Sequence, residues 1–123
     1  MTYFVLLIFS LITICPGKSF SQSLVNKAKA ERSSLQMSAA IELLKRPFEK
    51  PEEITQAFQN SGRLLRQIKD GRGLFLEVYA TSSESVNSYI VAGKFNHPDW
   101  VNQLLISFGN IYREIILNEL VGK

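Results

Sequence analysis

The sequence has one cysteine and one histidine among its 123 residues. A disulfide within the chain is therefore excluded, because a bridge needs two cysteines. A typical zinc site is disfavoured as well, since a lone histidine would need several carboxylates converging on it. The sequence also contains neither a Gly-x-Ser-x-Gly nucleophile elbow nor a phosphate loop ending in Gly-Lys-Ser/Thr. We expect no cofactor or metal, and a function in binding rather than in catalysis.

Strong charge of one sign is also absent. The chain has 14 basic and 11 acidic residues, which gives a formal net charge of +3. The nearest approach to a basic stripe is formed by four residues at a spacing of three: Arg63, Arg66, Lys69 and Arg72. We interpret them as the solvated side of a helix, because nucleic-acid-binding domains gather basic residues on one face or in one run. We therefore predict no nucleic-acid partner.

Long apolar runs are confined to the N-terminus. Residues 3–15 carry no charge and are almost wholly apolar. This run of about 13 residues is shorter than the roughly 20 that a membrane-spanning helix requires, and it matches the apolar region of a signal peptide. Ser19 and Ser21 then provide the small residues expected before a cleavage at Gln22. We predict a signal peptide over residues 1–21, similar to bacterial secretory signals.

Cys15 is the residue at which lipid anchoring would occur. Ile14 stands directly before it, where a lipidated cysteine requires a small residue, so we expect Cys15 to be an ordinary part of the signal segment. Residues 22–123 then form a single domain with no cysteine and no stable membrane span. We expect this mature chain to be exported and to reside in the periplasm or outside the cell.

Proline residues divide the mature chain into segments of helical periodicity. Pro51 and Pro98 suit the first position of a helix, where the missing N–H has no intrahelical acceptor to lose. Asp70 and Gly71 mark a turn or a helix start, and residues 60–62 weaken the middle of the helix before them. The predicted segments are residues 22–46, 51–68, 74–95 and 98–120, which gives an all-α fold of about four helices in a small bundle-like domain.

Residues 74–95 fit two patterns. The stretches LFLEVYAT and SYIVAGKF alternate and are rich in residues that favour strands, which would make a hairpin across SSESVN. As a helix, the same segment gathers most of its large apolar side chains on one face: Phe75, Val78, Tyr79, Val86, Tyr89 and Ile90. The alternative fold class is therefore α+β with a hairpin at 74–95. It would make the chain a small ligand-binding domain with a pocket lined by aromatic residues.

The segment 98–120 is apolar across a wide arc. Large side chains recur along one face at helical steps: Trp100, Leu104, Phe108, Ile111, Tyr112, Ile115 and Leu120. An exposed apolar stripe of several hundred Å² marks an interaction site. We predict that Trp100, Leu104, Phe108 and Ile115 form a partner surface, which would take a second copy of the chain or another protein.

Three polar residues form a weaker candidate site: Glu77, His97 and Asp99. His97 is the only imidazole, and an acid–base or metal role can be imagined for it with Asp99 two residues on. The surrounding Asn-His-Pro-Asp is typical of a helix start, with Asn96 or His97 as the cap. A reaction at these residues would need groups from another chain, so the enzymatic alternative is a truncated or accessory part of a helical enzyme.

The stretch from Asp70 to Ile116 resembles an uncharacterised all-helical family of unknown function. The resemblance rests on the following residues: Asp70, Gly71, Phe75, Tyr79, Val86, Phe95, Pro98, Trp100, Leu104, Phe108 and Tyr112. It implies a helix over 74–95 and no established activity. Members of that family continue into a second half with a further His-bearing helix, so the resemblance covers the N-terminal half only. A site built across both halves would be incomplete in this chain.

Overall fold

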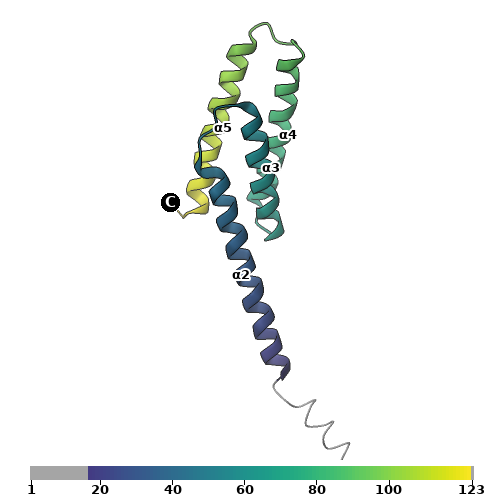
Figure 1. The fold of residues 1–123 in the computed structure, drawn as a ribbon, viewed down its shortest axis with the longest axis vertical. Helices are drawn as coiled ribbons and strands as arrows, with labels where there is room; N and C mark the ends of the chain where they lie inside the picture. Colours follow the sequence, from purple (N-terminus) through teal and green to yellow (C-terminus); the bar gives the residue numbers. More distant parts are fainter. Residues whose placement is uncertain (1–16, 123) are drawn as a thin grey trace, which may run out of the picture. The chain divides into compact units, whose positions relative to one another are not determined.

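A computed structural model describes residues 17–122 of the chain. It contains four labelled helices: α2 (Gly17–Lys45), α3 (Pro51–Gln67), α4 (Arg72–Val91) and α5 (Pro98–Leu120) (Figure 1). No strand occurs between residues 17 and 122, so the all-α prediction is confirmed and the alternative hairpin at 74–95 is wrong. The predicted signal peptide lies largely outside the described residues, and its predicted cleavage before Gln22 falls within α2.

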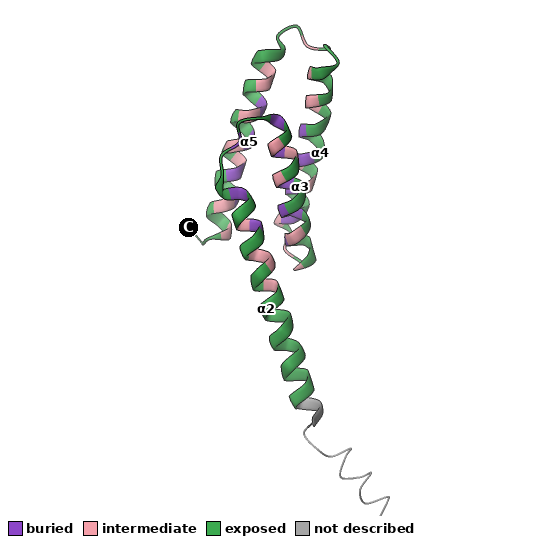
Figure 2. Cartoon of the chain, in the orientation of Figure 1, coloured by how far each residue is buried: buried purple, intermediate pink, exposed green. Residues whose placement is uncertain are grey.

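The chain divides into two compact units, residues 1–33 and residues 34–123. In the described part of the first unit, α2 exposes every side chain from Phe20 to Arg32. The second unit holds the C-terminal part of α2 and all of α3, α4 and α5. Its core is made of small and aliphatic side chains with two phenylalanines, shown as buried positions in Figure 2: Ala40, Leu44, Phe48, Ile54, Phe58, Leu65, Leu76, Ala80, Leu105 and Ile116.

The helix starts predicted from proline are confirmed, because α3 begins at Pro51 and α5 begins at Pro98. Glu53 in the first turn of α3 also stabilises the start of that helix. Its carboxylate accepts hydrogen bonds from the backbone N–H of Glu49 at 2.7 Å and of Lys50 at 3.3 Å. The bond from Glu49 is the main reason that the pKa of Glu53 lies below its ordinary value.

The α3 helix ends in a Schellman motif. The N–H of Lys69 donates to the carbonyl of Arg66, and the N–H of Asp70 donates to the carbonyl of Leu65, both at 2.9 Å. This geometry puts Lys69 at a φ of 61°, in the left-handed region that favours glycine. The end of α4 uses the same motif with the preferred residue, since Gly93 has a φ of 70°.

The α3 and α4 helices approach each other at two glycines. A Cβ atom added to Gly62 would lie 2.7 Å from the carbonyl oxygen of Gly73, and one added to Gly73 would lie 2.8 Å from the backbone nitrogen of Arg66. Both distances are far below van der Waals contact, so no side chain fits at either position. Gly62 therefore serves close helix packing, and α3 continues through it without a break.

Candidate interaction surface

The two sides of α5 differ in burial. Its buried residues are Leu105, Gly109, Arg113 and Ile116. The opposite side carries five large apolar residues, each more than one third exposed: Trp100 62%, Leu104 37%, Phe108 47%, Ile111 51% and Ile115 47%. We call these five residues the α5 face. It contains the four residues predicted as a partner surface together with Ile111.

The spacing of the α5 face is that of a helix-pairing seam. Leu104, Phe108, Ile111 and Ile115 follow one another at steps of four, three and four residues. This is the a/d pattern of a heptad repeat, in which alternate steps keep the side chains on one line facing a partner helix. Ile111 completes that line and was the residue missing from the predicted set.

A shallow groove borders the N-terminal half of the α5 face. It has a volume of about 360 Å³ and lies between the C-terminal part of α4 and the start of α5. Every residue lining it is apolar: Val86, Phe95, Trp100, Val101, Leu104, Leu105 and Phe108. We call it the α4–α5 groove. Because it borders Trp100, Leu104 and Phe108, the N-terminal half of the face is concave.

Asn110 fixes the rotation of α5 about its own axis. Its side-chain Oδ1 accepts the backbone N–H of Phe48 at 2.8 Å, and its Nδ2 donates to the carbonyl of the same residue at 3.0 Å. Phe48 lies in the connection between α2 and α3, so its two backbone groups have no partner in a regular helix. The bidentate contact satisfies both groups and turns the opposite side of α5 towards solvent.

Arg113 strengthens the same attachment. Only 5% of this residue is exposed, and its Nη1 donates to the carbonyl oxygen of Leu44 at 2.9 Å and of Lys45 at 3.5 Å. These carbonyls end α2, where the last turn lacks intrahelical donors and the helix dipole is negative. The Nε atom also donates to Asn110 Oδ1 at 3.2 Å. The buried cation is therefore compensated by carbonyl oxygens, with the exposed Glu114 carboxylate 3.6 Å from Nη2.

An aromatic cluster connects α5 with α3 and α4. The ring centroids of Tyr79 and Tyr112 are 5.0 Å apart, and those of Phe58 and Tyr79 are 5.2 Å apart. Phe75, which remains 43% exposed, lies 5.6 Å from Tyr112 and extends the apolar surface beyond α5. Burial raises the pKa of Tyr79, and the neighbouring Tyr112 adds to that shift.

The three polar candidates lie in different places. Glu77 is in the first half of α4, where its Oε2 is 2.6 Å from Nη1 of Arg66. His97 and Asp99 lie beyond the other end of that helix, at the start of α5. From Glu77 to the last residue of α4, Val91, is 14 residues, or about 21 Å of helix. The structure does not bring Glu77 together with the other two.

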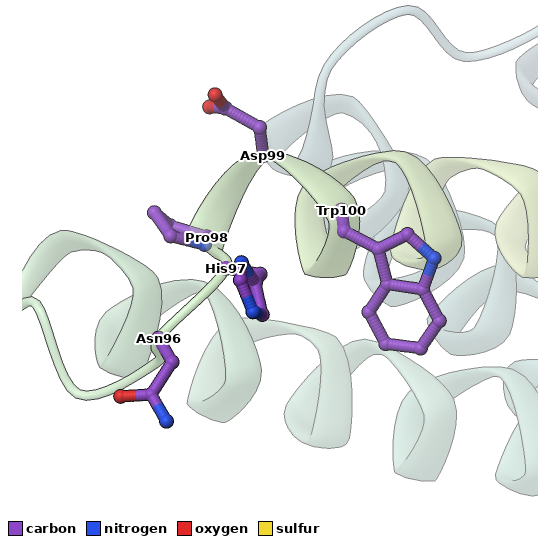
Figure 3. Close-up of a pocket in the computed structure, with 5 residues that line it drawn as sticks. All are labelled: Asn96, His97, Pro98, Asp99 and Trp100. Carbon is purple, nitrogen blue, oxygen red and sulfur yellow. The ribbon is translucent and has the colours of Figure 1, made fainter.

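His97 and Asp99 border an open hollow of about 700 Å³ formed by residues 96–100 (Figure 3). The Asp99 carboxylate points away from the His97 ring in this view. His97 occupies the cap position of α5, but its side chain makes no capping hydrogen bond. Within the part of the chain that the structure describes, no group of three or more His, Cys, Asp or Glu residues is placed to hold a metal ion.

Two residues of the predicted basic stripe are paired with carboxylates. Arg66 binds Glu77, and Arg72 binds Asp70 with its Nη2 at 2.6 Å from Oδ2. Asp70 Oδ1 also accepts the backbone N–H of Arg72 at 3.0 Å, so Asp70 takes part in the turn that leads into α4, whose N-cap position is Gly71. The hydrogen bond from the Arg72 side chain is the main cause that lowers the pKa of Asp70.

None of the described helices is long and apolar enough to cross a membrane.

A family model described as a family of unknown function (DUF5995) matches residues 52–119, which include α4 and most of α3 and α5. No curated protein and no solved structure matches the chain.

Proposed function

The chain belongs to the family of unknown function DUF5995, and we propose that it acts as a small helical interaction module that binds a protein partner through the α5 face. The observation that carries this proposal is the exposure of all five residues of that face beside a groove with an entirely apolar lining. Burying a large apolar side chain contributes about 1.5–3 kcal/mol. Five half-exposed side chains can therefore contribute roughly 5 kcal/mol to binding before the cost of association.

The three polar candidates do not come together in one site. Glu77 is already paired with Arg66 and is separated from His97 and Asp99 by most of α4. A general acid and base must both reach one substrate, within hydrogen-bond distance of its reacting atoms. Glu77 does not share such a position with His97 and Asp99, and we propose a non-enzymatic module on the strength of the α5 face.

A hydrophobic dye tests the proposed surface. The purified protein should bind 8-anilinonaphthalene-1-sulfonate, and the double variant Leu104→Ser with Phe108→Ser should lose most of the fluorescence gain. The matched control is Leu74→Ser with Val78→Ser, two residues of α4 that are 58% and 57% exposed but lie outside the α5 face. Residues 1–33 are unchanged in both variants, so any dye bound there contributes equally to the fluorescence of each. Equal fluorescence from the two variants would contradict the proposal.

We also propose that residues 1–21 export the protein, on the strength of the apolar run and the Ser19–Ser21 pattern. Fusion of residues 1–30 to a phosphatase that is active only outside the cytoplasm should give active enzyme. Replacement of two leucines by arginine at Leu6 and Leu7 should abolish that activity, because charge interrupts the apolar region. Full activity in the arginine variant would show that another feature directs the protein.

A further inference from the structure

We propose that the partner of the α5 face is a second copy of the same chain, packed antiparallel along α5 about a two-fold axis. This inference rests on the proposed function and names its partner. Three properties of the face support it: the apolar area, the difference in shape between its two halves, and the sign and position of the charges beside it.

The apolar area matches what a dimer requires. Taking a large side chain to present about 200 Å², five half-exposed side chains present roughly 500 Å². A standard interface buries about 800 Å² on each partner, of which about 60% is apolar, or roughly 480 Å². The α5 face thus supplies the apolar share of one side of such an interface without help from α2 or α3.

The two halves of the face have complementary shapes. The N-terminal half is concave, because the α4–α5 groove opens beside Trp100, Leu104 and Phe108. The C-terminal half presents Ile111 and Ile115, which are 51% and 47% exposed and do not line that groove. A two-fold axis between the halves sets the isoleucines of each copy over the groove of the other. The contact then forms twice, as isologous symmetry requires.

Charge favours the antiparallel direction. Glu114 and Glu119 are exposed on opposite flanks of the face, whereas Arg113 is buried, so the exposed charges of α5 are all acidic. A parallel pairing would set Glu114 of each copy on the same edge of the interface as Glu119 of the other, where like charges repel. An antiparallel pairing instead sets Glu114 beside the exposed Ser107 of the second copy, whose hydroxyl can donate to the carboxylate.

Sedimentation velocity of the purified protein over a wide concentration range tests this inference. We expect a monomer–dimer equilibrium. Phe108→Lys should raise the dissociation constant about a hundredfold or more, because it buries an unpaired charge at the centre of the interface. Val78→Lys, on an exposed position of α4 outside the face, is the matched control and should leave the dissociation constant unchanged. A dimer that survives Phe108→Lys would overturn the inference.

The direction of pairing has its own test, which also serves if Phe108→Lys fails to fold. Ser107→Lys changes an exposed flank residue and should lower the dissociation constant about fivefold, because each copy gains an ion pair with Glu114 of the other. The double variant Ser107→Lys with Glu114→Lys should weaken the dimer by placing two cations together. An unchanged or raised dissociation constant for Ser107→Lys would overturn the antiparallel arrangement.

One result separates this inference from the proposed function. A protein that stays monomeric at every concentration, and still binds the dye through Leu104 and Phe108, would overturn self-association while leaving the interaction surface intact. Its partner would then be a different protein. A monomer that binds no dye at the α5 face would contradict both.

Discussion

The α3–α4 pair and the attachment of α5 show two different ways of packing a helix. Gly62 and Gly73 let the backbones of α3 and α4 meet directly, which closes that interface with very small residues. The α5 helix is instead held by long side chains, through the aromatic cluster and through the contacts of Asn110 and Arg113. Because these attachments use only one side of α5, the other side keeps a full row of large apolar residues exposed. The α3–α4 contact thus depends on close approach of two backbones, whereas the attachment of α5 depends on side chains from one side of the helix.

The largest loss of stability is expected from a substitution at Gly73, in the α3–α4 contact. A Cβ there would overlap the Gly62 carbonyl oxygen and the Arg66 backbone nitrogen, neither of which can move without shifting α3. We expect Gly73→Ala to lower the free energy of unfolding by about 3 kcal/mol, measured by urea denaturation followed by circular dichroism. Gly71→Ala is the control, because nothing lies within 4 Å of its Cβ position. Equal stability of the two variants would show that the helices separate at little cost.

A substitution at Arg113 should weaken the attachment of α5. Replacing it by methionine keeps the aliphatic volume but leaves the carbonyl oxygens of Leu44 and Lys45 without their donor. We expect Arg113→Met to lower the free energy of unfolding by about 2 kcal/mol. Glu114→Gln removes the exposed carboxylate that lies 3.6 Å from Nη2 of Arg113 and should change stability by less than about 0.5 kcal/mol, which separates the loss of the carbonyl contacts from the loss of this ion pair. A neutral Arg113→Met would mean that Asn110 and the aromatic cluster hold α5 without Arg113.

A smaller effect is expected in the turn that joins α3 to α4. The pKa of Asp70 is lowered in the folded chain, mainly by its bond to Arg72. A lowered carboxyl pKa contributes stability that is present above the ordinary value of 3.8 and is lost as the pH falls through the folded value. Asp70→Asn keeps an acceptor for the Arg72 N–H but removes the ion pair with the Arg72 side chain, so we expect a cost of about 1 kcal/mol at neutral pH. Its difference from the natural chain should shrink in unfolding experiments below pH 3.8. A difference that does not change with pH would contradict this assignment.

The smallest effect is expected at Lys69, where a substitution should stabilise the turn between α3 and α4. Lys69 adopts the left-handed conformation at the same Schellman position that Gly93 occupies after α4. We expect Lys69→Gly to raise the free energy of unfolding by about 0.5–1 kcal/mol. Gly93→Ala should lower it by a similar amount, and the two variants together test one explanation with opposite signs. A loss of stability in Lys69→Gly would show that the lysine side chain contributes elsewhere.

Local features of the sequence predicted the helices well. Pro51 and Pro98 start their helices as expected, and Asp70 takes part in the turn that leads into α4. The segment 74–95 was open between helix and hairpin, since its apolar residues satisfy both periods. Residues 74–91 of it lie in the helix α4, which ends four residues earlier than predicted. The α4 helix contacts α3 near both of its ends, through Asn87 with Glu52 and Gly73 with Arg66, and no local pattern contains these contacts.

The residues that orient the α5 face could not be predicted from the sequence. Asn110 binds a residue 62 positions away, and Arg113 binds one 69 positions away, so neither lies in a pattern with its partner. In the sequence, Arg113 beside Glu114 is typical of a surface position. Its burial follows from its contact with the end of α2 in the folded chain. From the sequence alone, Gly62 likewise indicates only a weak point in a helix. Its role in close packing follows from the position of Gly73 in the folded chain. Ile111, in contrast, was within reach, because the steps of four, three and four residues include it.

The contact of Arg113 with the end of α2 also sets an order of events during synthesis. Leu44 leaves the ribosome long before residue 113 is made, and until then its carbonyl oxygen has only water as a partner. The C-terminal part of α2 therefore gains its final packing only when the chain is almost complete. Because a contact of such long sequence separation must close a long loop, it forms after the local helical turns of α2 and α5.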